Sequence, residues 1–271
     1  MRCEYCFHHC ILDEGQIGFC KGRIGQKDKI VSNNYGYLTA LALDPIEKKP
    51  LKEFYPGSKI LSIGSFGCNL RCPFCQNYQI SQYDLKDKCR YFTPEQIITE
   101  AKSLIPDGNI GIAFTYNEPL ISPEFVKDTA CLAKKNNLKT VLVTNGCFSL
   151  EALKMVSPYI DAMNIDLKGF SREYFSYIGA NLKMTEDFIK EAHKTSHIEL
   201  TTLIVPNHND SLSDMEKECE FISSINKDIP LHLTRYFPRY HEKEEMTKIS
   251  LMNELYSIAK KHLVHVYLGN I

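Results

Sequence analysis

The sequence lacks an excess of either charge. Its 271 residues carry 32 basic and 33 acidic side chains, which gives a formal net charge of −1. No basic excess marks a nucleic-acid-binding chain, and no block of like charges predicts a disordered tail. Internal repeats and low-complexity tracts are also missing. Composition therefore does not indicate nucleic acid as a partner, although it leaves a local basic groove open.

Long apolar runs are absent as well. The start of the chain, Met1 to Cys6, has no apolar core of the kind that a secretion signal needs. No run approaches the ~20 apolar residues of a membrane helix. We therefore expect a cytoplasmic protein with no membrane partner. In that reducing compartment disulfides do not explain eleven cysteines, and grouped cysteines more often bind metal or carry out redox chemistry.

The cysteines fall into three sets, two of them tightly grouped. The N-terminal set comprises Cys3, Cys6, Cys10 and Cys20. A triplet with the spacing C-x3-C-x2-C follows at Cys68, Cys72 and Cys75. The scattered set, which we expect to be structural, comprises Cys89, Cys131, Cys147 and Cys219. Free cysteine inside a core behaves as a small hydrophobic residue.

Strand-like and helix-like segments alternate from Lys59 onward. Strands are expected at residues 60–66, 110–114, 140–143, 162–166, 198–205, 231–236 and 264–268. Helices are expected at residues 93–105, 122–136, 149–156, 185–193, 211–225 and 246–262. Thr93 and Gln96 form a capping box at the first helix, and Thr185 is expected to cap the fourth.

Repeated strand–helix units predict a parallel sheet covered by helices. A complete eight-unit barrel takes about 250 residues, and the roughly 210 residues after Ser58 hold about six units and a final strand. We therefore predict an α/β fold, an incomplete (β/α)6 barrel over residues 57–271. A doubly wound open sheet is the alternative, because periodicity does not separate the two. In both folds the functional loops follow the C-terminal ends of strands.

Residues 1–56 have a different character. They are rich in Cys, Gly and Lys and show little long-range periodicity. The stretch 44–50 is interpreted as a linker or clamp, because Pro45 and Pro50 each disfavour helix at the residue before them. We predict a small Cys-rich metal-binding segment and linker over residues 1–56, followed by the barrel.

The triplet at Cys68, Cys72 and Cys75 lies in a loop after an expected strand. Thiolates are the usual ligands of iron–sulfur clusters. Three of them hold three irons of a cubane and leave the fourth without a protein ligand, which favours catalysis over simple electron transfer. The alternatives are a zinc site or buried thiols, but a structural zinc needs four ligands and no fourth is local.

The four N-terminal thiols lie within eighteen residues, and nearby glycines permit tight turns. The segment is too small to bury a core, so a bound metal would supply folding energy. Structural zinc is the first interpretation of this site, a second iron–sulfur cluster that relays electrons is the second, and redox-active free thiols are the third. We expect His8 and His9 to be solvated rather than ligands.

With an aromatic residue, Phe74, before its last cysteine, the triplet resembles the signature of radical S-adenosylmethionine (SAM) enzymes. The resemblance implies that Cys68, Cys72 and Cys75 hold a [4Fe–4S] cluster whose open iron binds the amino and carboxylate groups of SAM. Reduction of the cluster would then cleave SAM to methionine and a 5′-deoxyadenosyl radical. In such enzymes the cofactor carries the chemistry, and the protein orients and shields it.

The stretch from Cys72 to Asn77 is similar to the pyruvate formate-lyase activating enzyme group. This implies that Phe74 and Gln76 flank the adenine of SAM. The turn at 115–119 stands where that group has a Gly-Gly-Glu-Pro turn. In that group the turn binds the SAM amino group. Here Tyr116 and Asn117 replace the glycines, and Glu118 would accept from the ammonium. Asn tolerates positive φ better than most residues.

Further motifs resemble the same group at later strand ends. Thr144, Asn145, Asp166 and Lys168 are implied to lie near the SAM carboxylate and ribose, and we expect Asp166 and Lys168 to act in catalysis. Lys168 is a point cation suited to a carboxylate, although a surface Asp–Lys pair is the alternative. His232 or Arg235 could reach SAM or an anionic group of the substrate, or could belong to an ordinary half-buried strand.

Over its whole length the chain most resembles the radical SAM component of the AmmeMemoRadiSam system. The segments that carry this likeness are residues 44–51, 54–58 and 267–270. Many such relatives continue past the last segment with another cysteine pair, whereas this sequence stops at Ile271.

Two roles follow from the resemblance. The enzyme either activates a partner protein by taking hydrogen from a backbone glycine, or modifies a small molecule or another macromolecule. Both imply an electron donor such as ferredoxin or flavodoxin. The alternative from a different class is an iron–sulfur electron-transfer protein or a zinc-bearing interaction protein, in which the clusters would be closed.

Overall fold

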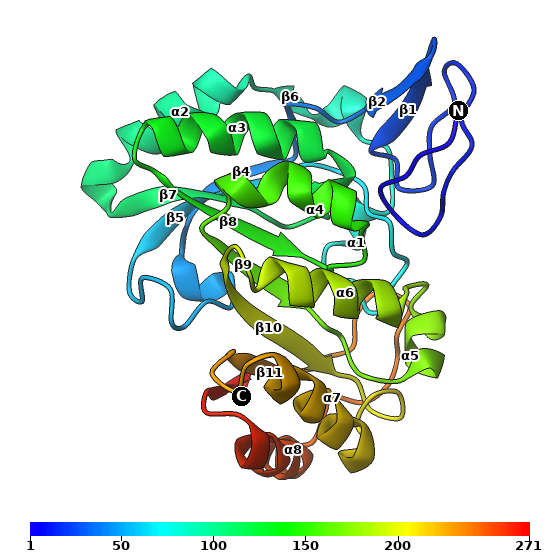
Figure 1. The fold of residues 1–271 in the computed structure, drawn as a ribbon, viewed down its shortest axis with the longest axis vertical. Coiled ribbons are helices and arrows are strands. Elements are labelled where there is room, and N and C mark those ends of the chain that lie inside the picture. The colour runs from blue at the N-terminus through cyan, green and yellow to red at the C-terminus, as the bar shows by residue number, and fades with distance from the viewer.

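The central feature is an eight-stranded sheet with the order β12-β11-β10-β9-β8-β7-β5-β4. A computed structural model describes residues 1–271 (Figure 1). The strands of this sheet are β4 (Ala40–Pro45), β5 (Lys59–Gly64), β7 (Asn109–Phe114), β8 (Lys139–Thr144), β9 (Ala162–Asp166), β10 (His197–Ile204), β11 (Leu231–Arg235) and β12 (Val266–Gly269). From β5 to β12 all neighbours are parallel, and β4 pairs antiparallel with β5.

The strand order decides between the two expected architectures. A doubly wound sheet reverses its strand order at a switch point, whereas here the parallel strands follow one another in chain order. The two edge strands, β4 and β12, do not pair with each other, so the curved sheet stays open. The incomplete barrel is therefore confirmed, and all C-terminal strand ends lie along one edge.

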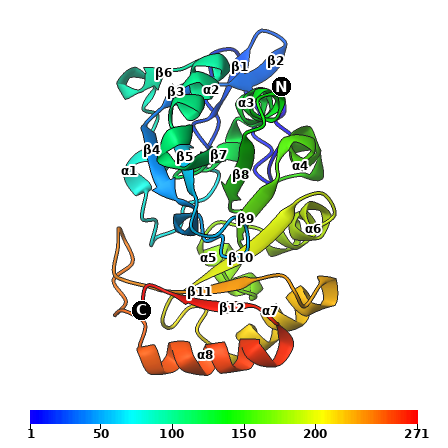
Figure 2. The same cartoon turned by 90° about the vertical axis from the view of Figure 1, so that its left-hand side faces the viewer.

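The longer helices follow the outer face of the curved sheet, whereas the single turn α1 (Tyr78–Ser81) lies apart from them beside β4 (Figure 2). The other helices are α2 (Pro94–Ser103), α3 (Pro123–Lys135), α4 (Leu150–Val156), α5 (Arg172–Tyr177), α6 (Leu182–Ala192), α7 (Leu212–Ile225) and α8 (Ile249–His262). The capping box at α2 is confirmed, because the Gln96 N–H donates to Thr93 Oγ1 at 3.3 Å and the Thr93 N–H donates to Gln96 Oε1 at 2.9 Å.

Three expectations about helices were wrong. α6 begins at Leu182 because Asn181 caps it, accepting from the Met184 N–H at 3.0 Å, so Thr185 lies inside the helix. α8 begins at Ile249 rather than Met246. The short helix α5, capped by Ser171, was not expected at all.

The segment 44–53 packs into the barrel instead of crossing its surface. Ile46 and Leu51 are fully buried against the strand residues Ile60, Ala113, Val141 and Ala162. Lys49 is 2% exposed, and its Nζ donates to Asp44 Oδ2 at 2.8 Å. Residues 1–56 thus contribute both β4 and a plug for the barrel interior, and the division of the chain after residue 56 stays a prediction.

The remaining elements are small. Two short antiparallel pairs join β1 (Arg23–Gln26) to β2 (Lys29–Ser32), and β3 (Tyr37–Leu38) to β6 (Arg90–Tyr91). Single turns of 3-10 helix occur at Ile46–Lys48, Lys86–Lys88, Ile105–Asp107, Pro119–Ile121 and Ser157–Tyr159.

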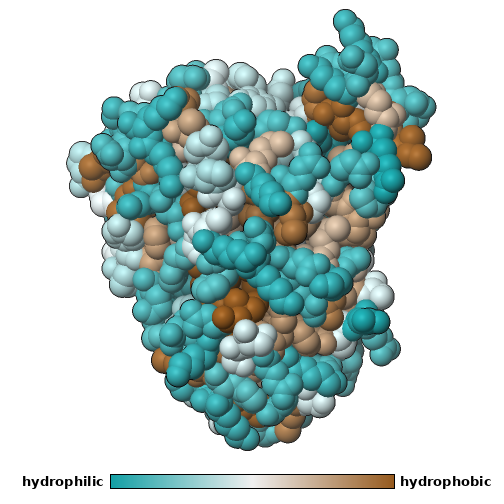
Figure 3. Space-filling model, in the orientation of Figure 1, coloured by the Kyte–Doolittle hydropathy of each residue, from teal (hydrophilic) through white to brown (hydrophobic).

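The surface is mainly hydrophilic on the face that Figure 3 shows. Apolar residues gather beside the projecting N-terminal segment (Figure 3). Ile11, Ile17 and Phe19, which belong to this part of the sequence, are among the exposed large hydrophobic side chains. None of the helices is both long enough and apolar enough to cross a membrane.

A buried carboxyl group on α7 generates a pH-dependent prediction. Glu218 is 1% exposed and accepts a hydrogen bond from the Thr202 hydroxyl, and burial raises its pKa to about 7. Between the ordinary pKa and this value the folded chain holds a proton that the unfolded chain has lost, so stability falls as pH rises. We expect Glu218→Gln to be more stable than wild type at pH 8, by up to about 3 kcal/mol, with little difference at pH 4.5.

Urea unfolding at the two pH values measures this difference. Glu216→Gln is the matched control, because Glu216 lies on the same helix with a side chain that is 43% exposed and binds His262. Equal stabilities of Glu218→Gln and wild type at pH 8 would contradict the buried ionisation.

Candidate functional site

The triplet lies in the loop of residues 65–77, named here the cysteine loop, which leaves the end of β5. Cys72 is buried, and Cys68 and Cys75 are half-buried. Cys68 Sγ accepts hydrogen bonds from the Leu70 N–H at 3.3 Å and from Asn145 Nδ2 at 3.7 Å. Amide groups directed at sulfur stabilise thiolates, so this donor set fits iron, which prefers soft sulfur ligands.

Burial and two neighbouring charged side chains act on the thiols of the triplet. Burial raises the pKa of Cys68 well above its ordinary value, and the Glu118 carboxylate raises it further. Burial raises the pKa of Cys72 to about 11, although the charge of Lys168 opposes that rise. Lys168 is thus the cation that faces the triplet, which brings the end of β9 to the cysteine loop.

Glu118 connects two strand ends beneath the cysteine loop. Its carboxylate, on a residue 3% exposed, accepts from the Leu120 N–H at 3.0 Å, the Thr144 hydroxyl at 2.8 Å and the Asn145 N–H at 2.8 Å. Burial raises its pKa to about 7. Glu118 therefore holds Thr144 and Asn145 in place, and Asn145 in turn contacts Cys68.

The turn before Glu118 differs from its expected form. Tyr116, not Asn117, takes the left-handed conformation, with φ of 69°. Its ring lies 4.6 Å from Lys49 Nζ, and its hydroxyl donates to Asp44 at 2.5 Å. Asn117 instead donates its side-chain amide to the Phe66 and Gly67 carbonyls, both at 3.1 Å. A tyrosine is tolerated here because contacts from the plug segment hold it.

Asp166 and Lys168 form a pair at the end of β9. Lys168 Nζ lies 2.9 Å from Asp166 Oδ2, and the two side chains, in that order, are 15% and 35% exposed. Burial acts to lower the pKa of Lys168, but the Asp166 carboxylate together with the charges of Cys72 and Cys68 outweighs burial and raises the pKa above its ordinary value. The ammonium thus stays charged beside the triplet, as binding of an anionic group requires.

Phe74 and Gln76 face different environments. Phe74 is 4% exposed and stacks against Tyr174 with ring centroids 6.4 Å apart, whereas Gln76 is exposed. Tyr174 was not singled out from the sequence, because a tyrosine in an unexpected short helix carries no motif. The two rings form an apolar wall beside Cys72.

His232 and Arg235 have partners away from the triplet. His232 Nε2 lies 2.6 Å from Glu199, which also accepts from the backbone N–H groups of Lys52 and Glu53. Arg235 Nε donates to the Thr247 carbonyl at 2.6 Å. His232 thus lies against Glu199, the residue that binds the plug segment, and Arg235 fastens the loop after β11.

The four N-terminal cysteines line one cavity, together with Tyr5, His8, Phe19, Arg23 and Phe148 among others. The backbone N–H groups of His8 and Gly22 act to lower the pKa of Cys6 and Cys20, respectively, but burial outweighs them. Burial raises the pKa of Cys6 to about 12 and that of Cys20 to about 11. Gathered thiols with amide donors fit a thiophilic metal.

The N-terminal cysteine segment, residues 1–22, touches the cysteine loop directly. His8 Nε2 donates to the Asn69 carbonyl at 2.8 Å, so the expectation that His8 is solvated was wrong. Arg71 donates to the Phe19 carbonyl at 2.6 Å. Gly67, with φ of 87°, lies so close to Cys20 that a Cβ would meet the Cys20 carbonyl oxygen at 2.3 Å. Sequence spacing held no signal for this contact.

Comparison with known proteins gives one family. Residues 62–222 match the model of the radical SAM superfamily. An uncharacterised protein of Methanocaldococcus jannaschii is 38% identical over 276 residues, covering 100% of this chain and 81% of that protein. A protein of the same organism named as a putative glycyl-radical enzyme activating enzyme is 27% identical, covering 80% of this chain and 91% of its own. A radical SAM methyltransferase structure from Sphaerobacter thermophilus has a TM-score of 0.60 at 13% identity. The match covers 79% of this chain and 67% of that chain.

The close contact at Gly67 generates a prediction. We expect Gly67→Ala to lower stability by about 2 kcal/mol or more, because alanine adds left-handed strain and a clash with the Cys20 carbonyl. Thermal unfolding of the anaerobic protein measures the effect.

Gly57→Ala is the matched control for this substitution. Gly57 has a similar φ of 81°, but no atom lies within 4 Å of the position that its Cβ would take. Its replacement should cost only the strain, about 1 kcal/mol. Equal losses in the two variants would show that the N-terminal cysteine segment does not press on Gly67.

Proposed function

Because the chain belongs to the radical SAM superfamily, we propose that it binds a [4Fe–4S] cluster through Cys68, Cys72 and Cys75. When bound and reduced, the cluster supplies the electron that cleaves SAM to a 5′-deoxyadenosyl radical. The observation that carries this proposal is the cysteine loop at the end of β5, where amide donors face Cys68 Sγ. The three thiols leave one iron free for SAM.

The spacing of the sulfur atoms supports a cluster over zinc. Tetrahedral zinc with Zn–S bonds of about 2.3 Å needs thiolates roughly 3.8 Å apart. Neither the triplet nor the N-terminal set brings three sulfur atoms within 4.8 Å of one another; the one group of three metal-type side chains that does so is His208, Glu242 and Glu244. A cubane, whose irons occupy separate corners, accepts more widely spaced thiolates.

The residues of this chain would hold SAM by charge and shape. Lys168 offers a cation to the SAM carboxylate, and Asp166 either orients Lys168 or accepts from a ribose hydroxyl. Asn145 and Thr144 stand beside Cys68, positioned by Glu118. The wall formed by Phe74 and Tyr174 suits the adenine, and it keeps water from the reacting atoms.

For the substrate we favour a partner protein. The relative named as a putative glycyl-radical enzyme activating enzyme matches over most of both chains, and the edge strands β4 and β12 do not pair, so the sheet stays open. In this role the radical takes hydrogen from a glycine of the partner, and a ferredoxin or flavodoxin supplies the electron.

For the N-terminal set we favour a second iron–sulfur cluster, the alternative to structural zinc. The spacing of the sulfur atoms supports a second cluster, and so does the position of this cysteine set. The Cys20 backbone packs against Gly67, the residue before Cys68, so the two thiol sets are neighbours. Neighbouring clusters could pass an electron to the site where SAM is cleaved.

The cluster proposal predicts a product. Anaerobically reconstituted protein with a strong reductant should convert SAM to 5′-deoxyadenosine, and the variant Cys68→Ala/Cys72→Ala/Cys75→Ala should form none. That variant should keep about half of the iron if the N-terminal thiols hold a second cluster, and zinc but no iron if they hold zinc.

Chromatography of the products and metal analysis give these two readouts separately. Cys131→Ala is the control, because Cys131 is a half-buried thiol on α3 away from both sets. Absence of 5′-deoxyadenosine from the fully loaded wild-type protein would exclude the proposed chemistry.

Lys168 generates a second prediction. Lys168→Ala should weaken SAM binding about tenfold, or ~1.4 kcal/mol, because the carboxylate loses its cation. Iron content should stay near that of wild type. Equilibrium binding of SAM and iron analysis test this, with Lys183→Ala as the control, since Lys183 pairs with Asp187 on an exposed helix face. A parallel loss of iron would mean that Lys168 supports the loop rather than SAM.

A further inference from the structure

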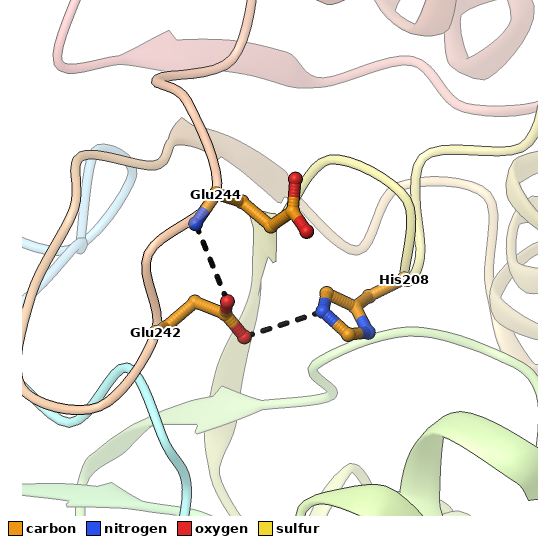
Figure 4. A group of neighbouring side chains, drawn as sticks. All are labelled: His208, Glu242 and Glu244. Carbon is orange, nitrogen blue, oxygen red and sulfur yellow. Dashed lines mark hydrogen bonds and ion pairs between the residues drawn. The ribbon is translucent and has the colours of Figure 1, made fainter.

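A group of three side chains outside the cysteine sets gathers at the site edge of the sheet. His208 lies in the loop after β10, and Glu242 and Glu244 lie in the loop after β11, residues 236–248, named here the mouth loop. One ligand atom from each residue lies within 4.8 Å of the other two (Figure 4). The N–H groups of His241 and Glu242 donate to the Pro73 carbonyl at 2.9 and 3.1 Å. The group therefore stands beside the cysteine loop.

No lysine or arginine balances the charge of this group. Glu242 is 7% exposed, and its carboxylate lies 3.2 Å from His208 Nε2. Neither Glu242 nor Glu244 forms an ion pair with a lysine or arginine. Two carboxylates held together, one of them buried, create a demand for a cation.

The carboxylate of Glu242 is held ready for such a cation. The Tyr177 hydroxyl donates to it at 2.7 Å, and the Lys243 N–H donates at 3.0 Å. Burial acts to raise its pKa, but these hydrogen bonds, a further one from the Glu244 N–H and the charge of His208 together outweigh burial and keep the pKa below its ordinary value. Glu244 is oriented by Asn207, whose side-chain amide donates at 2.7 Å. Such outer contacts are typical of metal ligands.

A second observation comes from Tyr174. Its ring lies between Phe74, at 6.4 Å, and His208, at 6.2 Å. The residue is 3% exposed, and its hydroxyl has no hydrogen-bond partner. A buried hydroxyl seldom stays unpaired in a finished site. The unpaired hydroxyl of this residue, whose ring neighbours both Phe74 of the cysteine loop and His208, therefore offers hydrogen-bonding capacity that a ligand would fill.

We propose that His208, Glu242 and Glu244 bind one divalent metal ion. One imidazole and two carboxylates suit a cation such as Mn²⁺ or Fe²⁺. Three protein ligands leave coordination positions open, as in catalytic rather than structural sites. The open positions would hold an anionic oxygen group of the substrate at the barrel mouth. This last role rests on the proposed function, whereas metal binding does not.

Binding of Mn²⁺ alone tests the proposal. The full chain, with its clusters reconstituted, is titrated with Mn²⁺, and the free ion is followed by its six-line EPR signal. Mn²⁺ is the suitable probe because it prefers oxygen and nitrogen ligands to the soft thiolates of both cysteine sets. We expect one bound equivalent, with nitrogen coupling from His208 in the spin-echo spectrum.

Three variants make the test specific. Glu244→Gln and His208→Gln should each weaken Mn²⁺ binding about tenfold or more, and His208→Gln should remove the nitrogen coupling. Glu245→Gln should bind as wild type does, because Glu245 is exposed and lies outside the group. Circular dichroism verifies folding. Binding unaltered in the first two variants, or no bound Mn²⁺ in wild type, overturns the proposal and leaves the group as a fastening between loops. SAM cleavage to 5′-deoxyadenosine is measured apart, so its failure is distinguishable.

Discussion

The buried carboxylate of Glu118 is the constraint on which the site depends. It joins the end of β7 to the residues that end β8, because it accepts from the Thr144 hydroxyl and the Asn145 N–H. Asn145 in turn holds the cysteine loop, because its side-chain amide donates to Cys68 Sγ and to Asn69 Oδ1. A carboxylate that is fully hydrogen-bonded inside the protein cannot move without leaving donors unpaired, at a cost of roughly 1–3 kcal/mol for each. The loop that carries three thiols is thereby given a rigid base.

The sequence predicted the parts of the fold that repeat. The strands β5 and β7 to β12 follow from alternating apolar segments, and the capping box of α2 follows from Thr93 and Gln96. The family resemblance, read from Cys68, Cys72, Cys75 and Phe74, is confirmed by the superfamily match. The strand order could not be read from periodicity. It needed the pairing of the parallel strands with one another in chain order, and the antiparallel edge strand β4 was hidden in a segment without clear period.

Contacts between distant segments were the part that residues alone did not reveal. Tyr116 takes the left-handed conformation that the glycines of the activating enzymes would suit. It is held there because Asp44 accepts a hydrogen bond from its hydroxyl and Lys49 lies over its ring. Those partners lie about 70 residues earlier in the chain, so no local rule relates them. In the same way Gly67 looks like an ordinary loop glycine until the Cys20 carbonyl is found against it.

These long-range contacts all support the cysteine loop or the turn beside it. The plug segment supports the turn at Tyr116, the N-terminal cysteine segment presses on the cysteine loop at Gly67, and the mouth loop reaches Pro73 from the opposite edge of the sheet. An incomplete barrel has no strand pairing across its gap, so its first loop would otherwise be supported on one side only. Segments from both ends of the chain supply the missing support. The mouth loop brings its carboxylates to the cysteine loop, which Lys168 faces, so the same contacts that support the opening also decide which charges surround it.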